Sequence, residues 1–351
     1  MSPVQYAQAQ RGRWGAALAA ALALSPLFLA GCGSKTGADK PRGNVLALSA
    51  GAQHACATFD NGELKCWGDN RYGQIGQFPR TAIQGQAQTA EHDSLPAPQI
   101  VVGLPASAGV VAGITHTCVF TTDRSLACWG GVDWARPARY RMLFNSSDAS
   151  FITQPALTIE QLSGVSQVSF GVHHLCALVP DEQVVCWGDN SKGQLGVNST
   201  AQYPTEQPTA VAGLPPVAQV AAGTFASCAV LQDGTVQCWG DNWSGQGSSL
   251  VPQVIDGLSG VVSLSMHRHG CALLQGGGVA CLGESPEGQA GEVISGASTT
   301  LAPLQAIDIG GTALQVAVGR TFSCALRDDE QVLCWGSNTH GQLGRALGPD
   351  A

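Results

Sequence analysis

Short apolar and β-branched stretches alternate with turn-forming residues along this chain from about residue 45 onward. Residues 56–59 and 63–66 are two such stretches, and they flank Asp60, Asn61 and Gly62, a triplet that favours turns and tolerates positive φ. If residues 60–62 form the loop, residue 59 faces residue 63, and counting outward places position 56 opposite position 66. The pattern therefore predicts a β-hairpin.

A β-branched stretch runs upstream of each hairpin, as at residues 217–223 and 314–319, and a proline-led segment precedes it, as at 208–211 and 252–255. Both kinds of segment are typical of strands. We expect each proline-led segment to be the outer strand of the hairpin that follows it, which gives four strands per copy. No such segment precedes residue 45, so we expect the ring to close poorly at the first copy, where residues 345–351 are the only other candidate.

The cysteines show that this unit is repeated. Of the 13 cysteines, 12 form six pairs whose members are ten positions apart: Cys56 and Cys66, Cys118 and Cys128, Cys176 and Cys186, Cys228 and Cys238, Cys271 and Cys281, Cys324 and Cys334. From one first cysteine to the next the intervals are 62, 58, 52, 43 and 53 residues, a period typical of propellers. We predict an all-β protein with one propeller of six blades, seven being possible, and four antiparallel strands per blade.

Each cysteine pair is predicted to form a disulfide within its own blade. Directly opposed positions of an antiparallel pair bring Cβ atoms to about 4.5–5.5 Å, close to what a disulfide needs. The alternative is zinc, but zinc sites commonly place their cysteines two to four residues apart, and a nine-residue gap across a hairpin does not fit that spacing.

The residues around the pairs form recurring motifs. Trp-Gly-x-Asn followed by Gly-Gln-Leu/Ile-Gly occurs at 67–76, 187–196 and 335–344. These motifs resemble the repeats of the regulator of chromosome condensation family, whose better-studied propellers have seven blades, and the resemblance covers residues 45 to about 344. Three copies depart from it: the second lacks the Gly-Gln-Leu-Gly, the fourth shortens it to 245–247, and the fifth has Met266 for the glycine and Leu282 for the tryptophan.

The N-terminal segment is expected to be a targeting signal. Arg11 and Arg13 precede an Ala- and Leu-rich stretch at 14–28, which is too short for a membrane span of about 20 residues. Residues 29–32 (Leu-Ala-Gly-Cys) resemble the lipobox of bacterial lipoproteins, with an ordinary signal peptide as the alternative. We therefore expect residues 1–31 to be a lipoprotein signal peptide, Cys32 to be the lipidated first residue, 32–44 to be a flexible tether, and 45–351 to be the propeller.

The charge and the compartment limit the partners. The net charge is −8, and removing residues 1–31, which carry two arginines and no acid, moves it to −10. An acidic protein is a poor partner for nucleic acid or anionic lipid, so the family's chromatin binding is not expected here, nor membrane contact except through the lipid anchor. Disulfides persist in the periplasm or at the cell surface. We expect a monomer in the cell envelope, with the outer membrane favoured.

The repeated polar residues are poor candidates for catalysis. Four histidines lie two residues before a first cysteine: His54, His116, His174 and His269. They could bind a metal as a ring or, as we favour, make local hydrogen bonds at strand ends. Acidic residues recur as Asp69, Asp189 and Asp241 in turns, whereas catalysis needs unlike groups that converge on one spot. We expect no catalytic residue, no cofactor and no metal.

The insertion at residues 131–155 of the second copy is the predicted partner-binding site. Tryptophan, tyrosine and arginine dominate binding hot spots, and this segment contains Trp134, Arg136, Arg139, Tyr140, Arg141 and Phe144. Its arginine stems could instead cover apolar surface of its own blade. The predicted function is a lipid-anchored binding propeller for a protein or glycan. The alternatives are an exported hydrolase acting in the central channel and an architectural surface protein.

Overall fold

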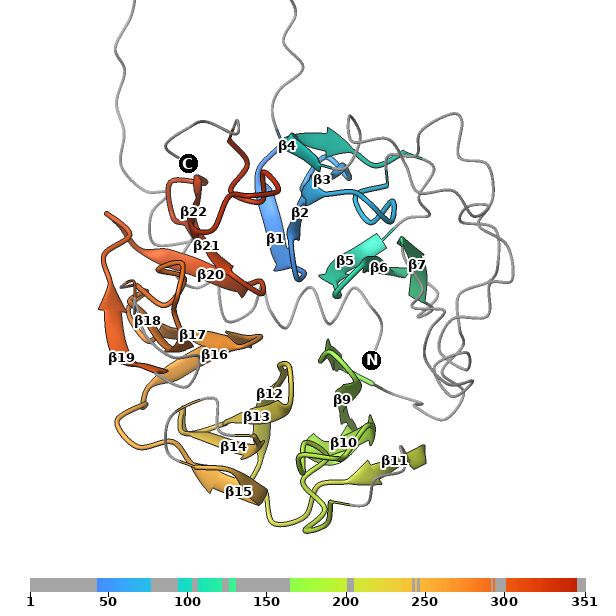
Figure 1. Cartoon of the computed structure of the whole chain (residues 1–351), viewed down its shortest axis with the longest axis vertical. Coiled ribbons are helices and arrows are strands. Elements are labelled where there is room, and N and C mark those ends of the chain that lie inside the picture. Colours follow the sequence, from blue (N-terminus) through green and yellow to red (C-terminus); the bar gives the residue numbers. More distant parts are fainter. Residues whose placement is uncertain are drawn as a thin grey trace, which may run out of the picture.

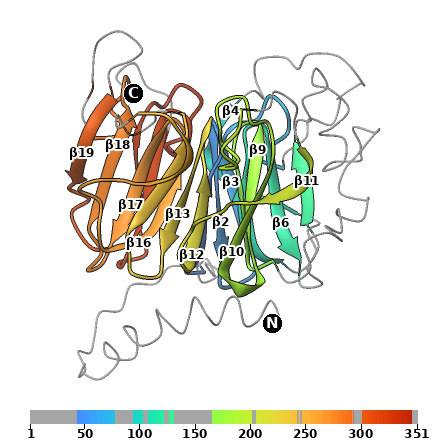
Figure 2. The ribbon, with the colours of Figure 1, turned by 90° about the horizontal axis from the view of Figure 1, so that it is seen from below.

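The computed structural model describes residues 43–76, 94–102, 107–121, 126–130, 165–200, 205–241, 244, 247–291, 293 and 301–345. These residues form six small antiparallel sheets arranged as blades around one axis (Figure 1). Seen from the side, the strands run across the thickness of the disc (Figure 2). One short 3-10 helix, η3 (Pro180–Glu182), is present in this part of the chain. In the residues described, no helix is both long and apolar enough to cross a membrane.

The blades follow one another along the chain. The first contains β1 (Val45–Ala50), β2 (His54–Phe59), β3 (Leu64–Asp69) and β4 (Ser94–Ile100), and the second β5 (Ser107–Ala112), β6 (His116–Thr121) and β7 (Leu126–Gly130). The third contains β8 (Gln167–Phe170), β9 (His174–Val179), β10 (Gln183–Gly188) and β11 (Thr205–Ala210), and the fourth β12 (Val217–Ala222), β13 (Ala226–Leu231), β14 (Val236–Gly240) and β15 (Ser249–Val254). The fifth contains β16 (Val261–Met266), β17 (His269–Leu274), β18 (Val279–Glu284) and β19 (Leu301–Ile307), and the sixth β20 (Ala313–Val318), β21 (Phe322–Arg327) and β22 (Val332–Gly336).

The register of the central hairpins agrees with the prediction. The amide of Phe59 donates to the carbonyl of Glu63 at 2.9 Å, and Cys56 lies directly opposite Cys66. Disulfides join the corresponding pairs in five blades: Cys56–Cys66, Cys176–Cys186, Cys228–Cys238, Cys271–Cys281 and Cys324–Cys334. In the second blade the backbone also sets Cys118 opposite Cys128, whose side chain lies outside the part of the chain described. The predicted pairing within blades is therefore confirmed in five of them.

The predicted assignment of the outer strands is wrong. The proline-led segments pair with the hairpin that precedes them, so that residues 208–210 belong to β11 of the third blade and residues 252–254 to β15 of the fourth. The first blade consequently has four strands, which contradicts the expected poor closure there. In the described residues it is the second and the sixth sheets that have three strands. The error arises because a strand between two hairpins is equally near to both in sequence.

The hydrophobic core is divided into layers between neighbouring blades. Between the first and second blades, Ile75 and Val101 pack with Trp129. Between the last blade and the first, Phe322 and Ala317 pack with Leu48, Trp67 and other residues. Inner strand β1 therefore lies beside both β5 and β20, and the ring is closed there by apolar contacts (Figure 1). The repeat unit cannot bury its apolar faces alone, so the joints between blades carry much of the stability.

Candidate interaction face

The histidines hold neighbouring blades together. His54 Nε2 lies 2.8 Å from the hydroxyl of Thr117 in the second blade, and His174 Nε2 lies 2.7 Å from the hydroxyl of Ser227 in the fourth. His269 Nε2 makes the same contact with Ser323 of the sixth blade at 2.7 Å. Each hydroxyl in turn donates to a main-chain carbonyl of the preceding blade, as Ser227 does to Gln194 at 2.9 Å. These histidines therefore make structural hydrogen bonds between blades, and not the local bonds that the sequence predicts.

Burial keeps the three imidazoles neutral. Desolvation lowers the pKa of His54 and of His269 to about 3 and that of His174 to about 4. A neutral imidazole has one N–H and one acceptor nitrogen, which suits a bond to a hydroxyl that also donates elsewhere. Among the residues that the structure describes, no group of three or more His, Cys, Asp or Glu side chains is placed to hold a metal ion.

At four joints, the turn formed by the Gly-Gln-Leu/Ile/Ala-Gly motif of one blade docks onto the tryptophan of the next blade. The indole of Trp239 donates to the carbonyl of Gln194 at 2.9 Å. Trp67, Trp129 and Trp335 make the same bond to the carbonyls of Gln342, Gln74 and Gln289 at 3.0 Å. The glutamine side chain meanwhile accepts a bond from the amide two residues earlier, as Gln194 Oε1 does from Lys192 at 2.8 Å. The motif is thus a folded turn that presents a carbonyl to the neighbouring blade.

A second type of joint uses a glutamine of the inner strand as a clamp. Gln219 of the fourth blade accepts a bond from the amide of Leu264 at 2.7 Å and donates to its carbonyl at 3.1 Å. Gln315 of the sixth blade clamps Leu48 of the first in the same way, at 2.8 and 2.7 Å. The position taken by a histidine elsewhere is apolar at these two joints, with Ala226 in the fourth blade and Phe322 in the sixth. Histidine joints thus link the first blade to the second, the third to the fourth and the fifth to the sixth, whereas glutamine clamps link the fourth blade to the fifth and the sixth to the first.

The joint between the second and third blades lacks all three devices in the residues described. Gly109 stands where the clamp glutamine would be, and Leu175 stands where the hydroxyl would be. The second copy has no Gly-Gln-Leu-Gly, and Trp187 of the third blade is only half-buried. One aromatic contact crosses the joint, with the His116 and Phe170 rings edge to face at 5.8 Å between centroids.

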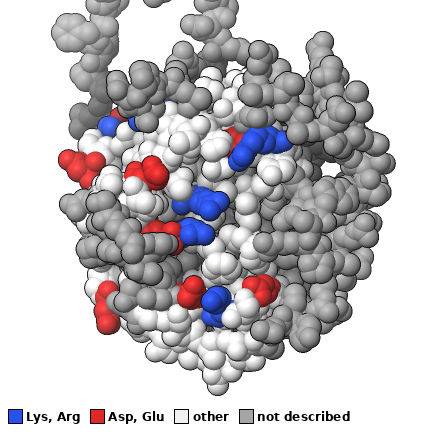
Figure 3. All heavy atoms as spheres, in the orientation of Figure 1, with Lys and Arg blue, Asp and Glu red and all other residues white. Residues whose placement is uncertain are grey.

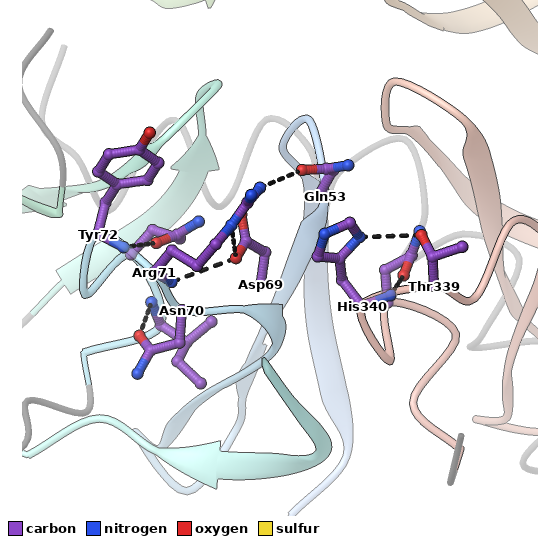
Figure 4. A network of polar contacts seen from close by, with 10 residues as sticks. Gln53, Asp69, Asn70, Arg71, Tyr72, Thr339 and His340 are labelled. Carbon is purple, nitrogen blue, oxygen red and sulfur yellow. Dashed lines mark hydrogen bonds and ion pairs between the residues drawn. The ribbon is translucent and has the colours of Figure 1, made fainter. Parts of the chain in front are cut away.

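Near the joint of the sixth and first blades, the structure forms a polar network on the face that carries the motif turns (Figure 4). Arg71 Nε lies 2.9 Å from Asp69 Oδ1, and Arg71 Nη2 donates to Gln53 Oε1 at 2.9 Å. The Asp69 side chain is 3% exposed and that of Arg71 is 44% exposed. Tyr72 is 54% exposed beside them, and His340 of the sixth blade lies across the joint with its pKa lowered by burial.

This network is an exposed arginine and tyrosine supported by a buried carboxylate, which is the composition of a binding hot spot. As expected for a turn residue, Asp69 accepts a bond from the amide of Arg71 at 3.2 Å. Arg71 and Tyr72 are not among the site residues predicted from the sequence. The available signal was that these two residues are large and differ from their counterparts in the third repeat, Ser191 and Lys192.

The predicted partner site and the predicted lipidation site are not placed by the structure. Trp134, Arg136, Arg139, Tyr140, Arg141 and Phe144 lie outside the residues described, and so does Cys32. Asp189 accepts a bond from the amide of Ser191, as expected for a turn residue. Asp241 accepts a bond from the Ser248 hydroxyl at 3.2 Å.

Sequence comparisons find the same repeats. The family model described as "Regulator of chromosome condensation (RCC1) repeat" matches residues 45–74, 165–194, 217–246 and 314–342, and a second model of that description matches 181–230. The chain is 28% identical to the ultraviolet-B receptor UVR8 of Arabidopsis thaliana over 321 residues, which are 87% of this chain and 68% of UVR8. It is also 28% identical to protein pim1 of Schizosaccharomyces pombe over 224 residues, 58% of this chain, and spans only 39% of pim1.

Comparison with solved structures gives the same fold. The structure of Prp20p from Saccharomyces cerevisiae matches with a TM-score of 0.60 at 19% identity, covering 87% of this chain and 74% of the other. Human WBSCR16 matches with a TM-score of 0.57 at 19% identity, covering 87% and 79%. Identities this low carry the fold alone. Family models thus find RCC1 repeats in this chain, and its structure is a β-propeller with six blades in the residues described.

Proposed function

We propose that this chain is a non-enzymatic interaction protein of the cell envelope, anchored through a lipid on Cys32, whose propeller presents turns and loops to a protein or glycan partner. The observation that carries the proposal is how the repeated polar side chains are used. The buried histidines, tryptophans and glutamines bond across the joints, and the turn aspartates bond within their own loops. Groups that make structural bonds in every repeat are not free for catalysis, so function falls to the side chains that differ between repeats.

The disulfides support an exported location. In the residues described, five disulfides lie inside the blades, and nine of their ten cysteines are buried. Proteins of the reducing cytosol rarely retain such bonds, whereas periplasmic and surface proteins do. Together with the lipobox-like Leu-Ala-Gly-Cys at 29–32, they favour a mature chain that begins at a lipidated Cys32 and is tethered through residues 33–44.

Relatives support the role of a platform for partners. Yeast RCC1 (Prp20) has been solved with Kap60 bound, and Prp20p binds Gsp1p and histones. We transfer only the use of a propeller as a binding platform, because this chain is acidic overall and differs from Prp20 at most positions. The expected contact surfaces are the loop at 131–155 and the face that carries Arg71 and Tyr72.

Crosslinking in intact envelopes tests the proposal. The full chain and a variant lacking residues 131–155 are compared, and a variant with residues 79–91 shortened is the matched control, because that segment is another insertion between strands. We expect a crosslinked partner with the full chain and the control, and its loss without 131–155. Capture of no partner by the full chain would favour the architectural alternative.

Fractionation tests the anchor independently. The Cys32→Ser variant should leave the membrane fraction or accumulate unprocessed, because the thiol that carries the lipid is gone. If this variant remained processed and membrane-bound, the lipoprotein assignment would be wrong, and an ordinary signal peptide would replace it.

A further inference from the structure

The turns that join the first and second strands of each blade form an inner ring on one face. At several joints, the residue after the turn glycine contacts the next blade through its main chain. Thr224 donates its amide to the carbonyl of His267 at 2.9 Å, and Arg320 donates its amide to the carbonyl of Ala52 at 2.9 Å. Side chains at these positions are therefore close neighbours around the axis.

Arginine side chains occupy this inner ring in only two of the six blades, as Arg268 of the fifth and Arg320 of the sixth. Burial keeps His267, next to Arg268, neutral by lowering its pKa to about 3. The corresponding positions in the second, third and fourth blades are neutral or apolar apart from one histidine: Ile114, Thr115, Val172, His173, Thr224 and Phe225. In Figure 3, which has the orientation of Figure 1, blue atoms of basic residues gather near the middle of the disc, and red atoms lie mostly further out. A local positive surplus thus stands out on a chain of net charge −8.

Buried nitrogen atoms of this cluster lack hydrogen-bond partners within the described chain. His267 Nδ1 lies 2.9 Å from the Thr224 hydroxyl, while His267 Nε2 is buried without a hydrogen-bond partner. Arg268 Nε is also buried without a partner, and Arg268 Nη1 reaches the two oxygens of Glu284 only at 3.4 and 3.3 Å. The guanidinium of Arg320 is exposed and has no acidic partner within 4.0 Å among the described residues. Buried donors without acceptors are rare and call for an explanation.

Arg268 and Arg320 lie close enough to His267 for their charges to lower the pKa of its imidazole. After burial, Arg268 and Arg320 are the causes that lower the pKa of His267, to about 3, and His267 in turn adds to the lowering at His269. The groups around His267 are therefore Thr224 from the fourth blade, Arg268 and His269 from its own blade, and Arg320 from the sixth. Glu284 pairs with Arg268, and no acid among the described residues pairs with Arg320, so the cluster keeps an unbalanced positive charge.

We propose that the turns of the fifth and sixth blades, through His267, Arg268 and Arg320, bind a carboxylate presented by an acidic segment of a partner protein. A carboxylate has two oxygens and about four acceptor sites, enough for the imidazole N–H and two guanidinium groups. The side chain of Glu284, itself 29% exposed, orients Arg268 without satisfying Arg268 Nε. The inference rests on the proposed function, since it names the chemistry of the partner.

A protein segment fits better than a free polyanion. The basic cluster is small, and the acidic groups elsewhere repel nucleic acid and anionic lipid. The polar network of the first blade offers Arg71 and exposed Tyr72 as a further contact on the same side of the ring. A short peptide can place one carboxylate at the cluster and extend along the turns, whereas an inorganic ion would use the cluster alone.

The test uses the purified mature chain and a fluorescent decapeptide of glutamate, followed by fluorescence anisotropy at physiological ionic strength. Arg320→Gln removes one exposed charge from the cluster and should weaken binding about tenfold, the loss expected for a charge-assisted hydrogen bond. Lys192→Gln is the matched control, because Lys192 is an exposed basic residue on a motif turn of the third blade. This variant should bind the peptide within a factor of about two of the parent chain.

Three results would overturn the proposal. Equal weakening by Arg320→Gln and Lys192→Gln would mean that the peptide responds to net charge and not to a site. No measurable binding of the peptide would rule out an acidic segment. The third result is that inorganic phosphate binds tightly, that this binding is lost in the Arg320→Gln variant, and that the peptide does not bind. The cluster would then be a site for a small oxyanion. None of these results depends on whether crosslinking in envelopes captures a partner, so the two proposals fail separately.

The imidazole of His267 gives a second readout. The ring is neutral, and both arginines lower its pKa, so a carboxylate bound at the arginines changes the electrostatic environment of the ring. The NMR signal of the His267 ring should therefore shift on addition of the peptide, while that of His174 stays unchanged. A structural effect of Arg320→Gln alone would not produce a peptide-dependent shift in the parent chain.

Discussion

Two joints of the same ring are built differently. One lies between the third and fourth blades, and the other lies between the second and third blades. At the former, His174 bonds to Ser227, and Trp239 bonds to the carbonyl of Gln194. The inner strands are linked as well, because the amide of Val220 donates to Gln167 Oε1 at 2.9 Å. At the latter, the positions of the partner hydroxyl and of the clamp glutamine are Leu175 and Gly109.

The difference teaches that the repeat motif acts between blades and not within one. A motif residue matters only if its partner is present in the neighbouring copy. The third blade has the tryptophan of the motif, Trp187. Its ring is nevertheless half-buried, because the second copy has no Gly-Gln-Leu-Gly to cover it. The second copy is also the one with the long insertion at 131–155, so one change in sequence both removes the docking turn and adds the predicted partner loop.

The largest expected effect comes from the two tryptophans. Trp239→Ala should lower the free energy of unfolding by about 3–5 kcal/mol, because the indole is 1% exposed and its loss leaves a cavity. Trp187→Ala should cost less than half as much, since that ring is half-buried and does not donate to a motif carbonyl. Denaturant unfolding of the oxidised chain measures both. Equal losses would show that the two joints are equally tight.

Acid should weaken the histidine joints next. The unfolded pKa of an imidazole is about 6.5, whereas that of buried His174 is about 4, so the unfolded chain takes up the proton first. Stability is therefore complete above pH 6.5 and declines as the pH falls toward 4, by about 1.4 kcal/mol per pH unit for each such histidine. The thermal midpoint measured between pH 7.5 and 4.5 gives this slope.

A paired substitution isolates one histidine in that slope. His174→Phe with Ser227→Ala copies the apolar pair Phe322 and Ala55 of the closing joint, and it should make the pH dependence shallower. Ser227→Ala alone is the control and should keep the slope, because His174 remains buried. A slope that is unchanged in the paired variant would mean that other groups cause the acid sensitivity.

The glutamine clamps are expected to contribute less. Gln219→Ala should cost about 1–3 kcal/mol, because it leaves the amide and the carbonyl of Leu264 without their partner. Hydrogen exchange of the Leu264 amide should become faster in the same variant. Gln253→Ala is the matched control, since Gln253 is exposed and donates only to the carbonyl of Pro252, and it should leave stability nearly unchanged. If Gln219→Ala and Gln253→Ala lowered the free energy of unfolding by similar amounts, the clamp would not be what stabilises this joint.

The smallest expected effect is a gain at the weak joint. Gly109 occupies the register of Gln219, and Val168 of the third blade occupies the register of Leu264. Gly109→Gln should therefore create a clamp and stabilise the chain by about 1 kcal/mol. Gly109→Ala separates this from the general gain of replacing glycine in a strand. If both variants gained equally, the new side chain would not be bonding across the joint.

Local features were predictable from the sequence because they depend on residues close together in the chain. The turn at 60–62 sets the register of its hairpin, and the register sets Cys56 opposite Cys66. Six copies of one spacing made the propeller predictable from the same reasoning. The outer strand was assigned to the wrong blade, because its proline-led segment has suitable partners on both sides in sequence.

The partners of the histidines could not be predicted in the same way. His54 bonds to Thr117, 63 residues away, and His174 bonds to Ser227, 53 residues away. A signal was present, since a hydroxyl residue precedes the first cysteine in the second, fourth and sixth copies and not in the others. That signal has meaning only once the order and the spacing of the blades are known.

The sequence by itself determined the hairpins, the disulfide pairs and the number of repeats, because turn residues and cysteine spacing act over a few positions. Only the tertiary structure decided to which blade each outer strand belongs, which joints are hydrogen-bonded, and that His267, Arg268 and Arg320 lie close together. The physical reason is that these arrangements depend on the closure of the ring, which brings residues from separate repeats into contact and leaves one joint without its partners.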